Sequence, residues 1–321
     1  MGKTQAVLRD ASEGLGSALR ILLVGQAAFA EEILRGLEAA GDSITAVVCP
    51  PDAGPKPDPV KAAALARGVP VHQFRSLKSP EARRAFAEAH ADLGVLAYVT
   101  QIVPEPLLHI PRLTSICFHP SLLPRYRGGS AIAWQLIRGE SESGVTVFWP
   151  DAGIDTGPIL LQRSAPVGPD DTAGSLYFKT LFPLGVQTVL DAVALVREGK
   201  APRVPQDESR ASYDPLCRDE HAAIDWSCPA AELHDLIRGC DPQPGAHTAW
   251  RGARLRLYEP RRVDARAGAT PGTVLAVAAE GLTVAAGDGA IRCARARNGG
   301  TKAAAAEVAR VVGIEAGSRL A

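Results

Sequence analysis

Residues 115–129 read Ser-Ile-Cys-Phe-His-Pro-Ser-Leu-Leu-Pro-Arg-Tyr-Arg-Gly-Gly, and the fold can be worked out from this stretch. Its apolar start, 116–118, predicts a short strand that ends at His119-Pro120, because proline cannot donate to a sheet ladder and holds the preceding residue extended. The proline and glycine residues that follow predict a shaped loop, and the apolar spacing of 131–137 predicts a helix. His119 is therefore expected at a strand end, where open α/β sheets carry their chemistry.

A second loop of the same kind follows another apolar strand. Residues 145–149 predict this strand, and residues 151–158, Asp-Ala-Gly-Ile-Asp-Thr-Gly-Pro, predict a tight loop after it. Asp155 lies in this loop, 36 residues after His119. An imidazole and a carboxylate on neighbouring strand-end loops form an acid–base pair if the loops converge.

The composition limits the class of protein. A chain of 321 residues is long for one core, so two domains are expected. Lys+Arg and Asp+Glu both number 35, and this balance disfavours a protein whose main task is to bind nucleic acid. The six cysteines lack C-x-x-C spacing, which argues against a metal site and indicates a reducing, cytoplasmic compartment.

The N-terminus and the apolar runs bear on targeting. Residues 1–19 lack an apolar core of the signal-peptide kind and predict a loose arm. No apolar run approaches the length that spans a bilayer, so no membrane partner is expected.

Strand and helix patterns alternate regularly through the first two thirds of the chain. This alternation predicts a doubly wound, Rossmann-like α/β domain over residues 20–205, closed by a long amphipathic helix at 171–199. The predicted strands are 20–25, 44–49, 69–74 and 93–99, and the predicted helices are 28–37, 60–67, 80–90 and 104–109. The second and third glycines of the G-x-G-x-x-G fingerprint are missing after Gly25, which disfavours a dinucleotide cofactor.

The remainder of the chain has a different pattern. A stretch rich in Pro, Arg and Ser predicts a linker, placed at 206–215, before a second domain at 216–321. That domain is expected to be a small OB-like β-barrel with one early helix, because short strands alternate with glycine turns. The helix is predicted at 232–238 and the strands at 254–258, 273–278, 282–286 and 290–294.

The motif of residues 119–128, followed by Gly153-Ile-Asp155-Thr-Gly157, resembles the signature of the 10-formyltetrahydrofolate-dependent formyltransferases. This family includes methionyl-tRNA, glycinamide ribonucleotide and sugar-amine formyltransferases, and the N-terminal hydrolase domain of 10-formyltetrahydrofolate dehydrogenase. The resemblance covers nearly the whole chain. Gly25-Gln26, the 100–104 turn and Leu181-Phe182-Pro183 are more similar to the hydrolase domain than to the tRNA enzyme.

The resemblance implies roles for individual residues. His119 and Asp155 would be catalytic, 10-formyltetrahydrofolate would be the formyl donor that leaves as tetrahydrofolate, and no metal is implied. The implied folate contacts are Gln101, Ile102, Val103, Ser121, Leu122, Leu123, Pro124 and Asp155.

Cys117 is a departure from the family pattern. Most transferases of the family carry Asn at this position, two residues before the histidine, and the hydrolase domain also lacks it. The resemblance therefore favours transfer of the formyl group to water, with release of formate. Transfer to methionyl-tRNA or to a sugar or other small amine stays open, as does a non-catalytic folate-binding protein.

Transfer to tRNA is disfavoured by the loop after Cys49, whose only cations are Lys56 and Lys61. Arginines in the C-terminal domain keep it open: Arg251, Arg254, Arg256, Arg261 and Arg262.

Several residues keep two interpretations. Arg125 and Arg127 would face the anionic tail of folate or a phosphate, or else solvent, and Cys117 is expected to be a small buried side chain rather than a nucleophile. Tyr98 and Phe74 are expected in the core. Three apolar residues fit either a pterin wall or the sheet core: Leu96, Ile102 and Leu123.

Overall fold

The computed structural model describes residues 17–264 and 268–321. The chain forms two compact units: one comprises residues up to 127 with 144–164 and 181–212, and the other comprises 128–143, 165–180 and the described residues from 213 onward. Most of the predicted arm at 1–19 lies outside the described residues. Its last residue, Leu19, is buried, and its N–H donates to the Asp42 carboxylate at 2.9 Å.

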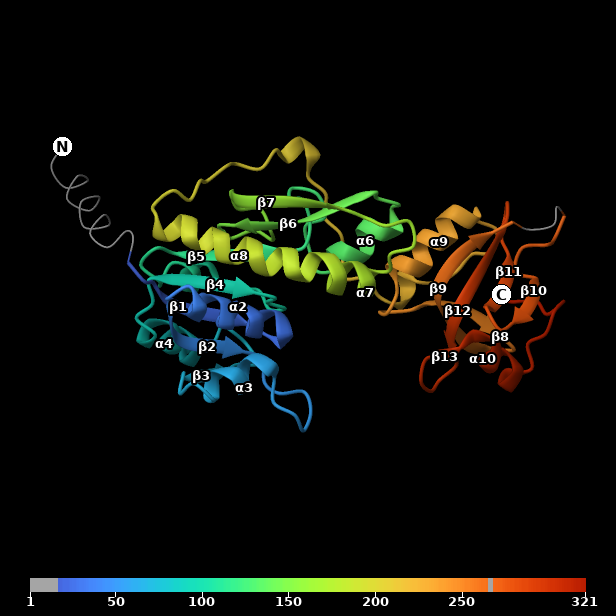
Figure 1. Ribbon diagram of the computed structural model, residues 1–321, viewed down its shortest axis with the longest axis horizontal. Helices are drawn as coiled ribbons and strands as arrows, with labels where there is room; N and C mark the ends of the chain where they lie inside the picture. Colours follow the sequence, from blue (N-terminus) through green and yellow to red (C-terminus); the bar gives the residue numbers. More distant parts are fainter. Residues whose placement is uncertain (1–16, 265–267) are drawn as a thin grey trace. The chain divides into compact units, whose positions relative to one another are not determined.

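The first unit contains a seven-stranded sheet (Figure 1). Neighbours from β3 to β5 are parallel, while β5 and β6 run antiparallel. The chain order reverses between β1 and β4, which confirms the predicted doubly wound α/β domain. Across the sheet the strands are β3 (Val71–Gln73), β2 (Ser43–Cys49), β1 (Arg20–Gly25), β4 (Leu93–Ala97), β5 (Ser115–His119), β6 (Glu142–Phe148) and β7 (Ile159–Pro166).

Helices cover both faces of this sheet. Leu22 and Val24 of β1 share a buried cluster with Phe86. Consecutive residues of a strand point to opposite faces, so Cys117 of β5 packs on this cluster while Phe118 packs on the other side, 4.4 Å from the Phe29 ring. The helices of this unit are α2 (Ala27–Ala39), α3 (Pro59–Leu65), α4 (Pro80–Glu88), α5 (Glu105–Leu108) and α8 (Phe182–Arg197).

The predicted long helix is present, as α7 (Ala173–Leu176), a π-helical turn (Tyr177–Leu181) and α8. The segment Ala173–Arg197 is long and apolar enough to cross a membrane by length and composition alone, so the expectation that no segment qualifies is wrong. In the structure, α8 lies along the sheet of the first unit and contacts α2 (Figure 1). A Cβ on Gly36 would come within 2.6 Å of Leu190, which shows how closely the two helices pack. The apolar residues of α8 therefore pack in the core of the first unit.

The second unit is built on an antiparallel sheet with the order β10-β11-β12-β9-β8, and β13 pairs with β12. This confirms the predicted small OB-like domain, with its early helix and all four predicted strands. Its elements are α6 (Ala131–Ile137), α9 (Ala230–Gly239), β8 (Ala246–Trp250), β9 (Ala253–Val263), β10 (Val274–Ala278), β11 (Gly281–Ala285), β12 (Ala290–Arg297), β13 (Ala303–Ala304) and α10 (Ala305–Val312).

Asp92 ties together the starts of two central strands. Its carboxylate accepts from the backbone N–H of Arg20 at 3.0 Å, from the Arg20 guanidinium at 3.2 Å and from the Arg112 guanidinium at 3.1 Å. Burial acts to raise the pKa of Asp92, but these hydrogen bonds lower it more, to about 2.

Replacing Asp92 by Asn should lower the free energy of unfolding at pH 7 by about 2 kcal/mol, the value of such a pKa shift. The folded-state pKa lies below the unfolded one, so this stabilisation is complete above about pH 4 and is lost as the pH falls towards about 2. Urea unfolding of both proteins from pH 7 to pH 2 measures the difference. Glu88→Gln, at an exposed carboxylate of α4, is the control, and a pH-independent difference for Asp92→Asn would contradict the assignment.

Candidate active site

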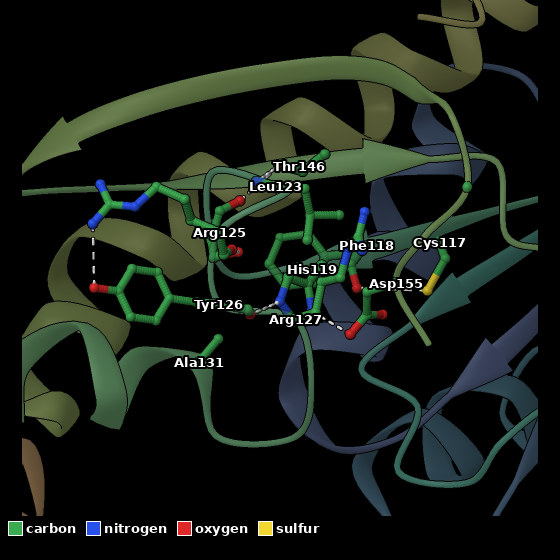
Figure 2. A network of polar contacts seen from close by, with 12 residues as sticks. Cys117, Phe118, His119, Leu123, Arg125, Tyr126, Arg127, Ala131, Thr146 and Asp155 are labelled. Carbon is green, nitrogen blue, oxygen red and sulfur yellow. Dashed lines mark hydrogen bonds and ion pairs between the residues drawn. The ribbon is translucent and has the colours of Figure 1, made fainter. Parts of the chain in front are cut away.

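His119 is the last residue of β5, and its imidazole is buried with 7% of the side chain exposed. Its Nε2 lies 2.7 Å from the carbonyl oxygen of Tyr126. A carbonyl only accepts, so Nε2 carries the proton that is donated there. The other ring nitrogen, Nδ1, faces the Asp155 carboxylate at 3.5 Å from Oδ2 (Figure 2). One nitrogen thus orients the ring and the other meets the carboxylate.

The loop after β6 holds Asp155. Its backbone φ is 55°, in the left-handed region, and its side chain is 18% exposed. Within the loop, the Asp151 carboxylate accepts from the Gly153 N–H at 3.0 Å and from the Thr156 hydroxyl at 2.6 Å. A Cβ on Gly157 would lie 1.8 Å from the Trp149 carbonyl, so only glycine allows the loop to close. The carboxylate is aimed by the shape of this loop.

Left-handed backbone recurs around the pair. Non-glycine residues adopt positive φ after β1 (Ala27, 59°), after β4 (Tyr98, 61°) and in the loop after β5 (Tyr126, 61°), as Asp155 does after β6. Each costs on the order of 1 kcal/mol and persists only where the surroundings impose it. Such strain is found at functional sites, and in this structure it also occurs away from the pair, at His90, Thr114, Arg251 and Glu259.

A third segment contacts both loops. The Tyr126 N–H donates to the Ser212 hydroxyl at 2.8 Å and the Arg127 N–H to the Ser212 carbonyl at 2.9 Å. The Gln206 amide donates to the carbonyls of Asp155 at 2.8 Å and Gly157 at 2.7 Å. The beginning of the predicted linker therefore lies against the site.

The predicted folate-binding residues differ in how far their side chains are exposed. Ser121, Leu123 and Pro124 are buried within their loop: the Ser121 hydroxyl donates to the Arg125 carbonyl at 2.7 Å, and the Leu123 carbonyl accepts from Gln162 at 3.0 Å. Leu122 and Gln101 are half-buried, Val103 is buried, and Ile102 is 71% exposed. Their contact with folate stays a prediction, and Ile102 is the member of the set most open to a ligand.

A pocket opens where β1, β2 and β4 end. Gly25, Gln26, Cys49, Phe74, Tyr98 and Gln101 are among its lining residues. The pKa of Cys49 is raised to about 11 by burial and by Asp58, so its thiol is neutral at pH 7. Every other lining side chain is uncharged by residue type, so the pocket as a whole is uncharged. Neither His119 nor Asp155 lines it.

Cys117 lies two residues before His119 and is half-buried. Burial, and then the nearby Asp155 carboxylate, raise the pKa of this thiol far above its ordinary value. The thiol therefore stays protonated at neutral pH, as expected for a side chain that is no nucleophile. Among the described residues, no group of three or more His, Cys, Asp and Glu side chains could hold a metal.

Sequence reasoning missed or misplaced several residues of this region. Tyr98, predicted in the core, is 45% exposed and follows the end of β4 with a left-handed backbone. Ile154, beside Asp155, is 42% exposed. Arg127 faces neither solvent nor an open cleft: it is buried against Glu208 and Gln206. The residue type of Tyr98 does not indicate a positive φ, so its exposure could not be predicted. The contacts of Arg127 were missed because they join residues about 80 positions apart.

Comparisons with known proteins agree with this architecture. Residues 19–192 match the formyl transferase family and residues 217–311 match the formyl transferase C-terminal domain. The chain is 42% identical over 245 residues to the mitochondrial 10-formyltetrahydrofolate dehydrogenase of Mus musculus, covering 75% of this chain and 26% of that protein. It is 42% identical over 281 residues to the methionyl-tRNA formyltransferase of Symbiobacterium thermophilum, covering 85% of this chain and 86% of that protein.

A solved structure shares the fold. HypX from Aquifex aeolicus, crystallised with tetrahydrofolic acid, superposes with a TM-score of 0.69 at 20% identity, covering 92% of this chain and 48% of that one. The present chain spans about a quarter of the length of the dehydrogenase relatives (26%).

Gly157→Ala should destabilise the protein by about 2 kcal/mol and move Asp155 away from His119, because the added methyl collides with the Trp149 carbonyl. Chemical unfolding and a crystal structure of the variant measure the two effects. Gly54→Ala is the matched control, since its added Cβ meets no atom within 4 Å. Wild-type stability together with an unchanged Nδ1–Oδ2 distance would show that the loop does not depend on this glycine.

Proposed function

The chain belongs to the formyl transferase family, and from this premise we propose that it removes the formyl group of 10-formyltetrahydrofolate and passes it to water. The products are formate and tetrahydrofolate. The observation that carries the proposal is the approach of His119 Nδ1 to Asp155 Oδ2, at 3.5 Å, from loops 36 residues apart in the sequence.

The nature of the site supports a folate as the donor. The dehydrogenase relatives are named for 10-formyltetrahydrofolate, and HypX was crystallised with tetrahydrofolic acid. A pterin is flat and uncharged, and exposed Tyr98, Ile102 and Ile154 offer apolar surfaces on the loops after β4 and β6. The pocket at the ends of β1, β2 and β4 is lined by uncharged side chains, so it has no charged group that would favour a phosphate-bearing ligand over an uncharged pterin.

The pair can perform hydrolysis as follows. The Asp155 carboxylate accepts a proton from water as the water oxygen attacks the formyl carbon. The charge that develops on the formyl oxygen is met by the Nδ1–H of protonated His119, since Nε2 is committed to the Tyr126 carbonyl. The bond between the formyl carbon and N10 then breaks as N10 takes up the proton that Asp155 accepted, which restores the carboxylate. Formic acid leaves and loses its proton to solvent as formate.

Cys117 favours water as the acceptor. The family resemblance implies that transferases use Asn at this position to bind the formyl oxygen, and a protonated thiol is a much weaker donor than an amide. Among the side chains, His119 must therefore provide most of the stabilisation of the charge on the formyl oxygen. Water needs no binding surface of its own, so this reduced site is sufficient for hydrolysis.

Methionyl-tRNA is the second candidate acceptor, because a methionyl-tRNA formyltransferase matches over 85% of this chain. Three of the five C-terminal arginines weigh against this acceptor. Arg256 lies 2.9 Å from the Asp219 carboxylate, Arg254 also pairs with Asp219, and Arg261 lies 3.4 Å from Asp170. Arginines already paired with carboxylates contribute less to binding phosphates than unpaired ones.

Two domains and a cytoplasmic location are also part of the proposal. The family matches at 19–192 and 217–311 support a catalytic domain at 20–205 and a separate C-terminal domain at 216–321. All six cysteines are free thiols, which supports a reducing, cytoplasmic compartment.

The deciding experiment incubates the protein with 10-formyltetrahydrofolate, with and without methionyl-tRNA, and follows formate and labelled acceptor together. Formate production at the same rate in both reactions is the expected result. Loss of formyl only when methionyl-tRNA is present would replace hydrolysis by transfer, and no loss in either reaction would favour a folate-binding protein.

Asp155→Asn should lower the rate of deformylation about 1,000-fold, because the variant removes the base and general bases contribute about 100- to 10,000-fold. Binding of tetrahydrofolate, measured by calorimetry, should change less than about threefold, since the amide keeps the shape of the carboxylate and tetrahydrofolate lacks the formyl group on which the carboxylate acts. Asp191→Asn on α8 is the control and should behave as the wild type. Ordinary turnover by Asp155→Asn would remove the carboxylate from the mechanism.

A further inference from the structure

We propose that Gln206 is a positioning residue for Asp155, and that the Arg127–Glu208 ion pair locks Gln206 in place. This inference rests on the proposed function, because it assigns Gln206 a role in the deformylation carried out by His119 and Asp155. The residues concerned come from three separate segments of the same compact unit.

The Gln206 amide holds the backbone on both sides of Thr156. Its Nε2 donates to the Asp155 carbonyl at 2.8 Å and to the Gly157 carbonyl at 2.7 Å. These two bonds fix the turn in which Asp155 adopts a φ of 55°. A left-handed aspartate is unfavourable by itself, so the turn needs such outside support to keep the carboxylate aimed at His119.

The direction of the amide is fixed by its partners. Its Oε1 accepts from the Arg127 guanidinium, at 3.2 Å from Nε and 2.8 Å from Nη2. A guanidinium only donates and a carbonyl only accepts, so the oxygen must face Arg127 and the nitrogen must face the Asp155 loop. An amide satisfies both sides, whereas a carboxylate satisfies only one.

Arg127 is itself anchored. It is 7% exposed, and its two terminal nitrogens pair with the two oxygens of Glu208 at 2.9 and 2.6 Å. This fork-to-fork geometry directs the guanidinium, while the Glu208 side chain is 67% exposed and its charge is screened by solvent. Glu208 lies two residues beyond Gln206, so the same short segment presents both the amide and the carboxylate to the guanidinium.

Together these contacts connect the two catalytic loops. Arg127 lies eight residues after His119 in the loop of that histidine, and Gln206 joins Arg127 to the loop of Asp155. The separation of imidazole and carboxylate is therefore set by this relay as well as by their own contact. A shift of about 1 Å in such a geometry costs about 100-fold in rate without a matching loss of ligand binding.

The test compares Gln206→Glu with the wild type. The variant keeps an oxygen for Arg127 but turns a second oxygen towards two carbonyls, so it should repel the Asp155 loop while the fold survives. We expect kcat for deformylation to fall about 100-fold, with tetrahydrofolate affinity within about threefold of the wild type. Gln243→Glu, the same change at an exposed glutamine, should leave both unchanged.

The same substitution in the Asp155→Asn background separates positioning from general structural damage. If Gln206 acts through the Asp155 carboxylate, Gln206→Glu should lower the residual rate by less than about threefold there. A full 100-fold loss in that background would overturn the proposal, as would wild-type kcat in Gln206→Glu alone. Should Gln206→Glu fail to fold, Gln206→Ala takes its place, with a fall in kcat expected and an unchanged kcat contradicting the role.

Failure of the proposed function is recognised separately. If the wild type itself does not deformylate 10-formyltetrahydrofolate, the proposed function fails and the role of Gln206 falls with it. If the wild type turns over and Gln206→Glu does so equally well, only the inference fails.

Discussion

The hydrogen bond between His119 Nε2 and the Tyr126 carbonyl is the contact on which the site depends. It keeps a proton on Nε2 and fixes the direction of a buried ring, so that Nδ1 is the nitrogen left to face Asp155. The carbonyl can serve in this way because the loop after β5 turns back on itself at Tyr126, whose φ is 61°. The strained loop thus orients the imidazole, and the oriented imidazole makes the proton-transfer chemistry possible.

The Asp155 loop meets this ring under a different set of constraints. Gly157 allows the loop to close, Asp151 holds its first turn, and Gln206 holds its second. None of these residues reacts, yet together they determine where the carboxylate oxygen lies. The Cys117 thiol stays protonated, so His119 and Asp155 are the side chains of this group that supply charge at the reacting centre.

The sequence predicted those parts of the site that depend on local pattern. The strand ending at His119, the helix at 131–137 and the tight loop at Asp155 were all recognisable from apolar runs interrupted by proline and glycine. The edge strand β7 escaped prediction because its sequence, Ile-Leu-Leu-Gln-Arg-Ser-Ala-Pro, is neither a continuous apolar run nor a regular apolar–polar alternation. β8 is short, and its sequence Ala-His-Thr-Ala-Trp has no clear apolar alternation. α10 was missed although its apolar residues do gather on one face, because it is only eight residues long. Gln206 was not identified, because a glutamine in a segment rich in proline and arginine has no local signal and its partners lie 49 to 79 residues away.

The most direct test of the account is a crystal structure of the protein with a folate analogue that carries a non-cleavable formyl group at N10. The account predicts that the formyl oxygen lies within hydrogen-bond distance of His119 Nδ1 and that the Asp155 carboxylate lies within reach of a water beside the formyl carbon. A formyl group bound away from both side chains, with the His119–Asp155 contact intact, would contradict it.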